Sequence, residues 1–329
     1  EYPKPLERLI IQYPLRKYME LTKIQVEKIC KKLGEPLTSF LFLAKGNHNS
    51  NYVVNTPKNK YVLRIENNLQ FKNLKKEYDL LNSLKSGIGP HAYLFDNSHK
   101  IMRNNYLVEE FIQGKHPTDK ANDNFVKAMA VWFKNLHIIK TSKAPACSRK
   151  GYYSLSCAVR PYYNNFRKYN HAISENLREE IREVFCKALK FCRTNDKLFS
   201  GQKGFSLLHK DPSKDNILMH NNKVRLIDWE FATYGVSEWD LVYFLQSYKF
   251  KKHHEKLFLK TYGYPQNRNT RKRLEMISLL NLCGGIGYSV WRLALLEQGK
   301  INKGEKKEIT ARLRQDTRLL KAIIDRLEK

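Results

Sequence analysis

The sequence predicts an α+β protein in two parts: a small N-terminal part around an antiparallel sheet and a larger, mostly helical C-terminal part. Short β-rich segments separated by polar turns concentrate between residues 39 and 112, and long segments with helical periodicity dominate beyond residue 117. A chain of 329 residues also exceeds what one compact core usually holds. With a crossing point near Glu110–Lys115, we expect domains at 1–112, with a leading helix in 1–35, and at 113–329.

The N-terminal part is expected to contain five strands and two helices. Three β-rich segments, "SFLFLAKG", "NYVVNTP" and "KYVLRIE", alternate with the turns "NHNS" and "PKNK" between Ser39 and Glu66. Residues 70–86 have apolar side chains at helical spacing and end at "SGIGP", and two more strands follow in "HAYLFD" and "NYLVEEFI". The leading helix is expected over 6–33, ending at Gly34 and Pro36.

The C-terminal part is predicted to be helical apart from one hairpin. Helical spacing runs through 122–139, 158–170, 174–195, 238–262, 271–298 and 304–327. Within 205–232, "ILMHNNKVRLIDWEF" predicts a short hairpin. The apolar stretch Met276–Leu296 is interrupted by glycines, Asn281 and Arg292, so we expect a buried helix or helix pair and no membrane span.

The strong positive charge does not by itself identify a binding partner. Sixty Lys and Arg against 32 Asp and Glu leave a net charge of +28. The basic residues are spread from Lys4 to Lys329, so we favour a generally basic surface over a nucleic-acid or other polyanion interface. The six cysteines form no C-x-x-C pair, which argues against zinc and thioredoxin chemistry. Isolated cysteines and the lack of an apolar leader favour the cytoplasm.

The segment "LLHKDPSKDNILMHNNKVRLIDWEFA" carries the strongest chemical signal. His209, Asp211 and Asn216 stand as H-x-D-x-x-x-x-N, and Asp228 follows after two apolar segments, as in a kinase catalytic loop with its metal-binding Asp. One carboxylate, Asp211, can take or orient the proton of an acceptor hydroxyl. The Asn216 amide and the Asp228 carboxylate suit Mg²⁺. We expect His209 to brace this loop by hydrogen bonds.

Residues of the sheet region are candidates for binding the phosphates of a nucleotide. The turn between the first two strands can leave backbone N–H groups for phosphate oxygens. Its candidate residues are Gly46, Asn47, Asn49 and Ser50. Arg64, two strands later, could reach the α and β phosphates, and Glu77 on the following helix could pair with it. Each feature alone also fits an ordinary turn, a surface cation or a surface acid.

The connector after the last strand is the candidate adenine site. "YLVEEFIQG" is an apolar strand followed by a short link, and such a link presents backbone N–H and C=O groups to a base. Glu110, Phe111 and Ile112 are the predicted contacts. An ordinary junction between strand and loop is the alternative.

Together these motifs resemble the aminoglycoside phosphotransferase and choline/ethanolamine kinase superfamily. The similarity rests on "GNHNSNYVV…YVLRI", "EYDLLNSL", "LVEEFIQG", "HKDPSKDNIL" and "LIDWEFATYGVSEWDL", over residues 40–245. It implies a two-lobed protein-kinase-like fold, ATP and Mg²⁺ as cofactors, and transfer of the γ-phosphoryl group to a small-molecule hydroxyl. It further implies Asp211 as catalytic base, Asn216 and Asp228 as magnesium ligands, and a structural role for Asp240.

Departures from the protein kinases favour a small acceptor. Ser213 stands where they carry Lys or Arg, Trp229-Glu230 replaces Phe-Gly, and only a short segment separates Asp228 from Asp240. This leaves little room for a peptide-binding platform. Within the superfamily, Lys210 replaces a frequent Gly and Pro212 replaces the usual Leu, which could alter the loop.

The acceptor itself is less well defined. Tyr288 and Trp291 in "GYSVWRLALLEQ" resemble the aromatic pair of choline kinases, although core aromatics fit the pattern equally well. Choline kinases also carry an acid about two helical turns after the position of Asp240, and this sequence has none there. Glu230 is the extra acid near the predicted metal site. We expect a choline- or ethanolamine-like amino alcohol. An aminoglycoside, homoserine or a sugar, and a non-catalytic scaffold for nucleic acid or another polyanion, are the alternatives.

Overall fold

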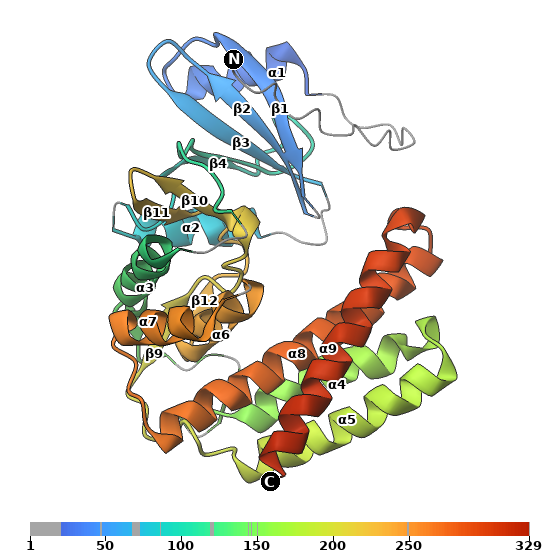
Figure 1. Ribbon diagram of the computed structural model, residues 1–329. Helices are drawn as coiled ribbons and strands as arrows, with labels where there is room; N and C mark the ends of the chain where they lie inside the picture. The colour runs from blue at the N-terminus through green and yellow to red at the C-terminus, as the bar shows by residue number, and fades with distance from the viewer. Residues whose placement is uncertain are drawn as a thin grey trace, which may run out of the picture. The chain divides into compact units, whose positions relative to one another are not determined.

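The computed structural model describes residues 21–328 except 47, 68–72, 86, 119–121, 144, 146, 150 and 249 (Figure 1). Its contacts divide the chain into two compact units. The first comprises the described residues up to Lys75 together with Ala92–Phe111. The second comprises Lys76–His91 and the described residues from Ile112 onward.

The first unit is an antiparallel five-stranded sheet in the order β1-β2-β3-β5-β4. Its strands are β1 (Ser39–Lys45), β2 (Asn49–Asn55), β3 (Lys60–Glu66), β4 (Ala92–Asp96) and β5 (Tyr106–Glu110). All five predicted strands are confirmed. Alternation along β3 turns Tyr61, Leu63 and Ile65 to the face that packs against a helix, as the period of two requires.

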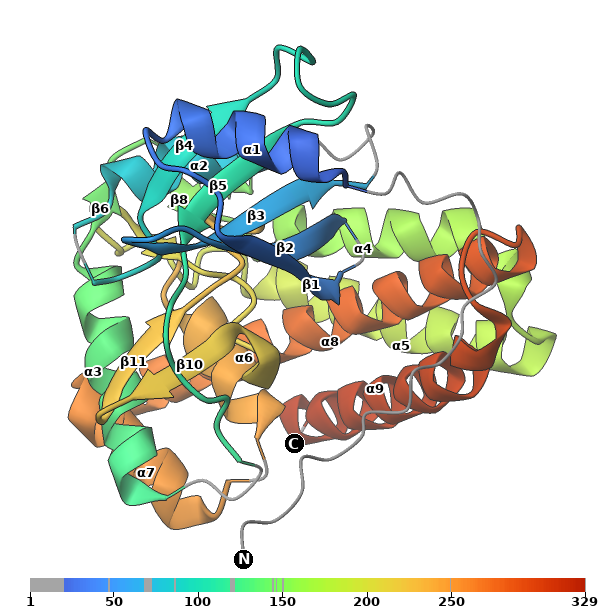
Figure 2. The same ribbon diagram turned by 90° about the horizontal axis from the view of Figure 1, so that it is seen from above.

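Helix α1 (Lys23–Lys32) covers that face of the sheet (Figure 2). It begins after Thr22, whose side chain accepts a hydrogen bond from the Gln25 backbone in a capping box. Its apolar stripe packs with the sheet residues in one buried cluster through Val26, Ile29 and Cys30. The predicted end near Gly34 is confirmed, because Gly34 has the left-handed φ of +76° that often ends a helix. Residues 6–20 of the predicted helix lie outside the described residues.

The second unit is mostly helical, as predicted. Its helices are α2 (Leu74–Ser83, which begins at the unit boundary), α3 (Asp123–His137), α4 (Leu155–Tyr169), α5 (Glu175–Thr194), α6 (Glu238–Ser247), α7 (Lys252–Tyr262), α8 (Arg268–Glu297) and α9 (Lys306–Leu327). Helices α4, α5, α8 and α9 lie side by side in both views and share one large apolar cluster (Figures 1 and 2).

The single helix predicted over 238–262 is wrong, because the chain forms two helices there, α6 and α7. Tyr248 and Lys251 adopt extended backbone angles, with ψ of 149° and 157°. The break lets the Tyr248 ring become buried against Phe125 and Phe244. Burial of one large aromatic side chain offsets the few helical hydrogen bonds that the break removes.

The predicted hairpin is confirmed, and several short strands accompany it that the sequence did not predict. The hairpin pairs β10 (Ile217–His220) with β11 (Lys223–Leu226) through Asn221 and Asn222, whose φ angles of +48° and +60° suit a tight two-residue turn. The others are β6 (Lys140–Thr141), β9 (Phe205–Leu208) and β12 (Thr233–Gly235) in one sheet, and β7 (Ser148–Arg149) with β8 (Tyr152–Tyr153). Strands of two to four residues are too short to show a period of two.

Helix α8 is the apolar segment that the sequence assigned to the core. Among the described residues it is the helix whose length and composition would suffice to cross a membrane, with a mean hydropathy of 1.3 in its most apolar window. Of that window, 61% is buried inside the protein, and Met276, Ile277 and Leu280 are fully buried. The buried helix that the sequence predicted is confirmed.

We expect Gly89→Ala to destabilise the second unit, because a Cβ there would lie 2.9 Å from Leu81 and 3.0 Å from the Trp229 ring. Overpacking of this kind costs about 1–3 kcal/mol of unfolding free energy. Gly201→Ala is the matched control, since no atom lies within 4 Å of its Cβ position. Urea denaturation of both variants checks this, and equal stability would show that Leu81 and Trp229 move aside freely.

Candidate active site

A buried carboxylate at the start of α6 organises the loop that carries Asp211. Asp240 is fully buried, and its two oxygens accept hydrogen bonds from the backbone N–H groups of His209 and Lys210, both at 2.8 Å. His137, at the C-terminal end of α3, makes a third hydrogen bond to Asp240 through its Nε2 at 3.2 Å. Burial alone would raise the pKa of Asp240, but the donors from His137 and His209 outweigh it and lower the pKa.

His209 makes the bracing contacts expected of it. Its Nδ1 accepts from the Asp211 backbone N–H at 3.3 Å, so its Nε2 carries the proton and donates to the Ile227 carbonyl at 3.1 Å. Burial lowers the pKa of His209, which keeps the ring neutral. The ring therefore connects the Asp211 loop to the strand that leads into Asp228.

Lys210, which replaces the frequent Gly expected from the sequence resemblance, has a backbone conformation that favours glycine. Its φ of +72° lies in the left-handed region, which glycine adopts without strain. The Lys210 ammonium lies 3.3 Å from the centroid of the Trp239 ring. Burial lowers its pKa to about 8, although the Asp240 charge acts in the opposite direction. The cation–π contact helps the chain to tolerate a lysine in this conformation.

Asp211 and Asn216 lie together, as the spacing of the motif predicted. Asn216 Nδ2 donates to both the backbone oxygen and Oδ2 of Asp211, each at 3.0 Å. Because the amide nitrogen makes these hydrogen bonds, the side-chain oxygen of Asn216 is the atom that remains to bind a metal ion. The Ile227 N–H donates to the Asn216 carbonyl at 2.9 Å, which brings Asp228 to the same loop.

Asp228 sits on a strained backbone at this junction. Its φ is +67°, and non-glycine residues in this region cluster at functional sites. The next residue, Trp229, is buried, and its backbone N–H donates to Glu77 Oε1 of α2 at 2.8 Å. A carboxylate and an amide oxygen form the oxygen donor set that Mg²⁺ prefers, so Asp228 and Asn216 fit that ion. Glu230 is buried two residues further on, and its place beside a substrate stays a prediction.

Tyr243, which the sequence did not single out, contacts Asp211 directly. It lies on α6, one turn after Asp240, and its hydroxyl hydrogen-bonds to the Asp211 carboxylate. Burial, with the Asp211 charge, raises the pKa of Tyr243, while Arg312 of α9 acts against this shift and Tyr288 of α8 adds to it. An aromatic residue one helical turn after a structural Asp was the available sequence signal.

The predicted aromatic pair on α8 is in place and partly accessible. The rings of Tyr288 and Trp291 lie 5.5 Å apart at 49°. Tyr288 is 38% exposed, which argues against a core role. The Arg292 guanidinium lies 5.8 Å from the Tyr288 centroid, so the face of this ring already accommodates a cation.

Asp316 of α9 supplies a carboxylate beside the same face of α8. A Cβ on Gly285 would collide with Asp316 Oδ2, and Gly285 lies one helical turn from Tyr288. Burial raises the pKa of Asp316 to about 6, against the effect of Arg312, whose Nε is 3.8 Å from Oδ2. Arg312 thus acts on both Asp316 and Tyr243. We call Tyr243, Tyr288, Trp291 and Asp316 the acceptor face, after the acceptor that we propose below for these residues.

In the first unit, Arg64 belongs to a buried polar group. Arg64 is 4% exposed, and its Nη1 lies 3.7 Å from Glu109 Oε2 on the neighbouring strand β5. The buried Asn49 amide, oriented to satisfy both of its ends, accepts from Arg64 Nη2 at 3.2 Å. Arg64 is therefore no solvent-facing cation. Its pairing with Glu77 would join the two units and stays a prediction.

The remaining predicted nucleotide residues fall at the strand ends. The β1–β2 turn is closed by the Gly46 N–H, which donates to the Asn49 carbonyl at 2.8 Å, and the Ser50 hydroxyl donates to Asn67 at 2.7 Å. Asn47 lies outside the described residues. Glu110 ends β5, the Phe111 N–H donates to the Lys60 carbonyl at 3.3 Å, and Ile112 is buried. Their contact with a nucleotide stays a prediction.

The fold and this loop define a small-molecule phosphotransferase of the kinase-like class. The chain matches the model of the phosphotransferase enzyme family over residues 39–270. It belongs to that family. This confirms the sequence-based resemblance and the assignment as an enzyme that transfers phosphoryl groups to alcohol acceptors.

Two curated relatives are LicA homologues. One, from Mycoplasma capricolum subsp. capricolum, is 24% identical over 223 residues, covering 67% of this chain and 78% of the relative. The other, from Metamycoplasma hominis, is 39% identical over 56 residues. That match covers 17% of this chain and spans only 22% of the relative's length.

Solved structures show the same fold. A candidate aminoglycoside phosphotransferase from Ralstonia eutropha has a TM-score of 0.70 at 13% identity, covering 93% of this chain and 98% of that one. The choline kinase LicA from Streptococcus pneumoniae has a TM-score of 0.63 at 18% identity, with 90% and 98% covered. A spectinomycin phosphotransferase bound to ADP and spectinomycin scores 0.60 at 14% identity, with 92% and 99% covered. At such identities the likeness establishes the kinase-like fold.

We expect Asp240→Asn to lower the unfolding free energy by about 2–4 kcal/mol, because the amide places an N–H donor against a backbone donor and removes a buried charge from its partners. Turnover should fall too, since the Asp211 loop loses its anchor. Glu255→Gln on the exposed surface of α7 is the control for loss of one acid. Urea denaturation checks the effect, and an unchanged midpoint would contradict the anchoring role of Asp240.

Proposed function

We propose that this protein is an ATP-dependent kinase that phosphorylates the hydroxyl of a small amino alcohol of the choline class. The observation that carries the proposal is the geometry of the H-x-D-x-x-x-x-N loop, where Asn216 Nδ2 lies 3.0 Å from Asp211 Oδ2 and the buried Asp240 holds the backbone before Asp211. The LicA homologues and the choline kinase LicA support the acceptor class. The ADP complex of the spectinomycin phosphotransferase supports a nucleotide donor.

The contacts of Asp211 position its carboxylate to act on an acceptor hydroxyl. Asn216 donates to one of its oxygens, and the Tyr243 hydroxyl also bonds to the carboxylate. An ionised carboxylate has about four lone-pair sites, so capacity remains for the acceptor O–H. Asp211 would orient this hydroxyl and take its proton as the bond to phosphorus forms. Direct in-line transfer needs no covalent enzyme intermediate, because positioning and electrostatics supply most of the barrier reduction.

The donor side of the reaction would rest on Asn216 and Asp228. These residues would hold Mg²⁺, which when bound neutralises charge on the transferred phosphoryl group. Glu77 holds the backbone next to Asp228 through the Trp229 N–H, and His209 ties the preceding carbonyl to the loop. Arg64, the Gly46–Ser50 turn and Glu110–Ile112 would contact the phosphates and the base.

The acceptor face suits a cation that carries a hydroxyl. Aromatic faces attract a quaternary or protonated amine, and Tyr288 and Trp291 supply them. The sequence showed no acid on α6 in the expected place, and Gln246 there is bonded to Asn281 of α8 at 2.6 Å. Asp316 supplies a carboxylate from α9 instead, and burial raises its pKa to about 6. A bound cation would favour its ionised form.

We expect Asp211→Asn to abolish turnover while the protein stays folded. The amide cannot take the proton of the acceptor, and general-base catalysis of this kind contributes about 10²–10⁴-fold. Asp215→Asn is the matched control, an exposed acid of the same loop, and should keep its activity. The assay is ADP release with Mg²⁺ against choline, ethanolamine, homoserine, sugars, nucleosides and aminoglycosides. Full activity of Asp211→Asn would refute the mechanism, and release only with another acceptor would replace the choline class.

A second expectation concerns pH. A carboxyl whose pKa is raised in the folded state destabilises that state once it is ionised. The loss of unfolding free energy caused by Asp316 is therefore absent below pH 3.8, grows toward pH 6 and is complete above it. Asp316→Asn should therefore stabilise the free protein by about 3 kcal/mol at neutral pH and have little effect near pH 4.

Binding of a cationic acceptor should show the complementary dependence. The KM for choline should fall as the pH rises through 6 and lose this dependence in Asp316→Asn. The exposed Asp325→Asn on the same helix is the control for both measurements. A stability gain without any change in KM would leave Asp316 as a partly buried acid that takes no part in acceptor binding.

A further inference from the structure

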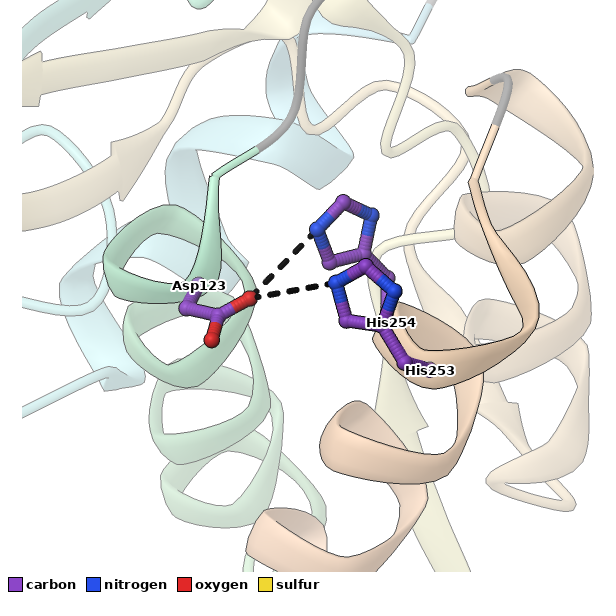
Figure 3. A group of neighbouring side chains, drawn as sticks. All are labelled: Asp123, His253 and His254. Atoms are coloured by element: carbon purple, nitrogen blue, oxygen red, sulfur yellow. Dashed lines mark ion pairs between the residues drawn. The ribbon is translucent and has the colours of Figure 1, made fainter.

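Three potential metal ligands meet at the first turns of α3 and α7, and the chemistry proposed above does not use them. Asp123 is the first residue of α3, and His253 and His254 are the second and third residues of α7. Figure 3 shows the three side chains pointing toward one another from the two helices. Their ligand atoms all lie within 4.8 Å of one another.

The spacing of these atoms fits an ion better than hydrogen bonds. Asp123 Oδ1 lies 3.6 Å from His253 Nε2 and 3.4 Å from His254 Nε2. An N–H···O hydrogen bond is usually about 2.7–3.2 Å long. In a tetrahedral site with metal–ligand distances of about 2.0–2.1 Å, neighbouring ligand atoms are about 3.3 Å apart. The two separations from Asp123 Oδ1 are close to that edge length, and the third pair of ligand atoms lies within 4.8 Å.

Burial and ring packing hold one of the two imidazoles in place. The His254 side chain is 9% exposed, and its ring packs edge-on to Phe250 and 3.9 Å from the His253 ring, measured between centroids. Within the described part of the chain, its Nδ1 is buried without a hydrogen-bond partner. His254 Nε2, which faces Asp123, is thus the nitrogen available to a metal. Asp123 and His253 are exposed, which leaves the remaining coordination positions open to water.

We propose that Asp123, His253 and His254 form a site for a divalent transition metal of the zinc class. Two imidazoles and one carboxylate are ligands that Zn²⁺, Co²⁺ and Ni²⁺ accept, whereas Mg²⁺ prefers oxygen ligands alone. The site is therefore chemically distinct from the Asn216 and Asp228 pair.

The position of this site suggests a structural role. The C-terminal ends of α3 and α7 meet where the Tyr262 hydroxyl contacts His137 Nδ1 at 2.9 Å, so the two helices run in the same direction. His137 is the residue that donates to Asp240. A metal at the N-terminal ends would tie together the helix pair whose other end supports the Asp211 loop. It would add stability to the second unit without touching reacting atoms.

The test is a titration of the full chain, freed of metal by a chelator, with Co²⁺ and Zn²⁺. Excess Mg²⁺ in the buffer occupies the oxygen sites, and a Cys186→Ser background removes the exposed thiol as a competing ligand. Isothermal titration gives affinity and stoichiometry, and the d–d absorption of Co²⁺ reports tetrahedral geometry. These readouts do not depend on kinase activity, so this proposal can fail while the proposed function stands.

We expect one saturable site, with affinity at least about tenfold lower in Asp123→Asn and in His253→Asn, because loss of a ligand costs at least as much as loss of an outer-shell partner. Zn²⁺ should raise the unfolding midpoint of the parent but not of these variants. His171→Asn is the matched control, an exposed histidine that faces Glu297. Equal affinity in all variants, or no saturable binding in the micromolar range, would overturn the proposal.

Discussion

The second unit depends on one buried anion. The Asp240 carboxylate has no contact with water, and its cost of burial is offset by three donors, two of them backbone N–H groups of the loop that precedes Asp211. A carboxylate that accepts several hydrogen bonds keeps its charge and fixes the position of every donor. The loop residues before Asp211 are thereby held at the N-terminal end of α6.

This anchoring permits backbone strain where the chemistry is expected. Lys210 and Asp228 both adopt left-handed φ angles, which cost about 1–3 kcal/mol for residues with side chains. Such conformations persist only where the surroundings determine them fully. Asp240 holds the first of these residues through its N–H, and His209 and Glu77 hold the backbone on either side of the second. The strain thus lies within a network of buried hydrogen bonds.

The elements that the sequence predicted were those with a long or strong local signal. Strands of five to seven residues and helices of ten or more showed their periods, and the H-x-D-x-x-x-x-N spacing placed Asp211 beside Asn216. The break at Tyr248 was missed, because its cause is burial of a ring against helices distant in sequence. Tyr243 and Asp316 were missed for the same reason. A tyrosine on a helix and an acid near the chain end can be recognised as site residues only after the packing of α6, α8 and α9 is known.

The lysine that packs on an indole in the Asp211 loop has an evolutionary consequence. Lys210 tolerates a backbone conformation suited to glycine, and the Trp239 face receives its ammonium. Replacing Trp239 alone would leave a partly buried cation without this aromatic partner, and replacing Lys210 alone would leave the indole uncovered. The two positions should therefore be constrained jointly, because changing either residue alone removes the cation–π contact between them. Substitutions at one site should be accepted or rejected according to the residue at the other.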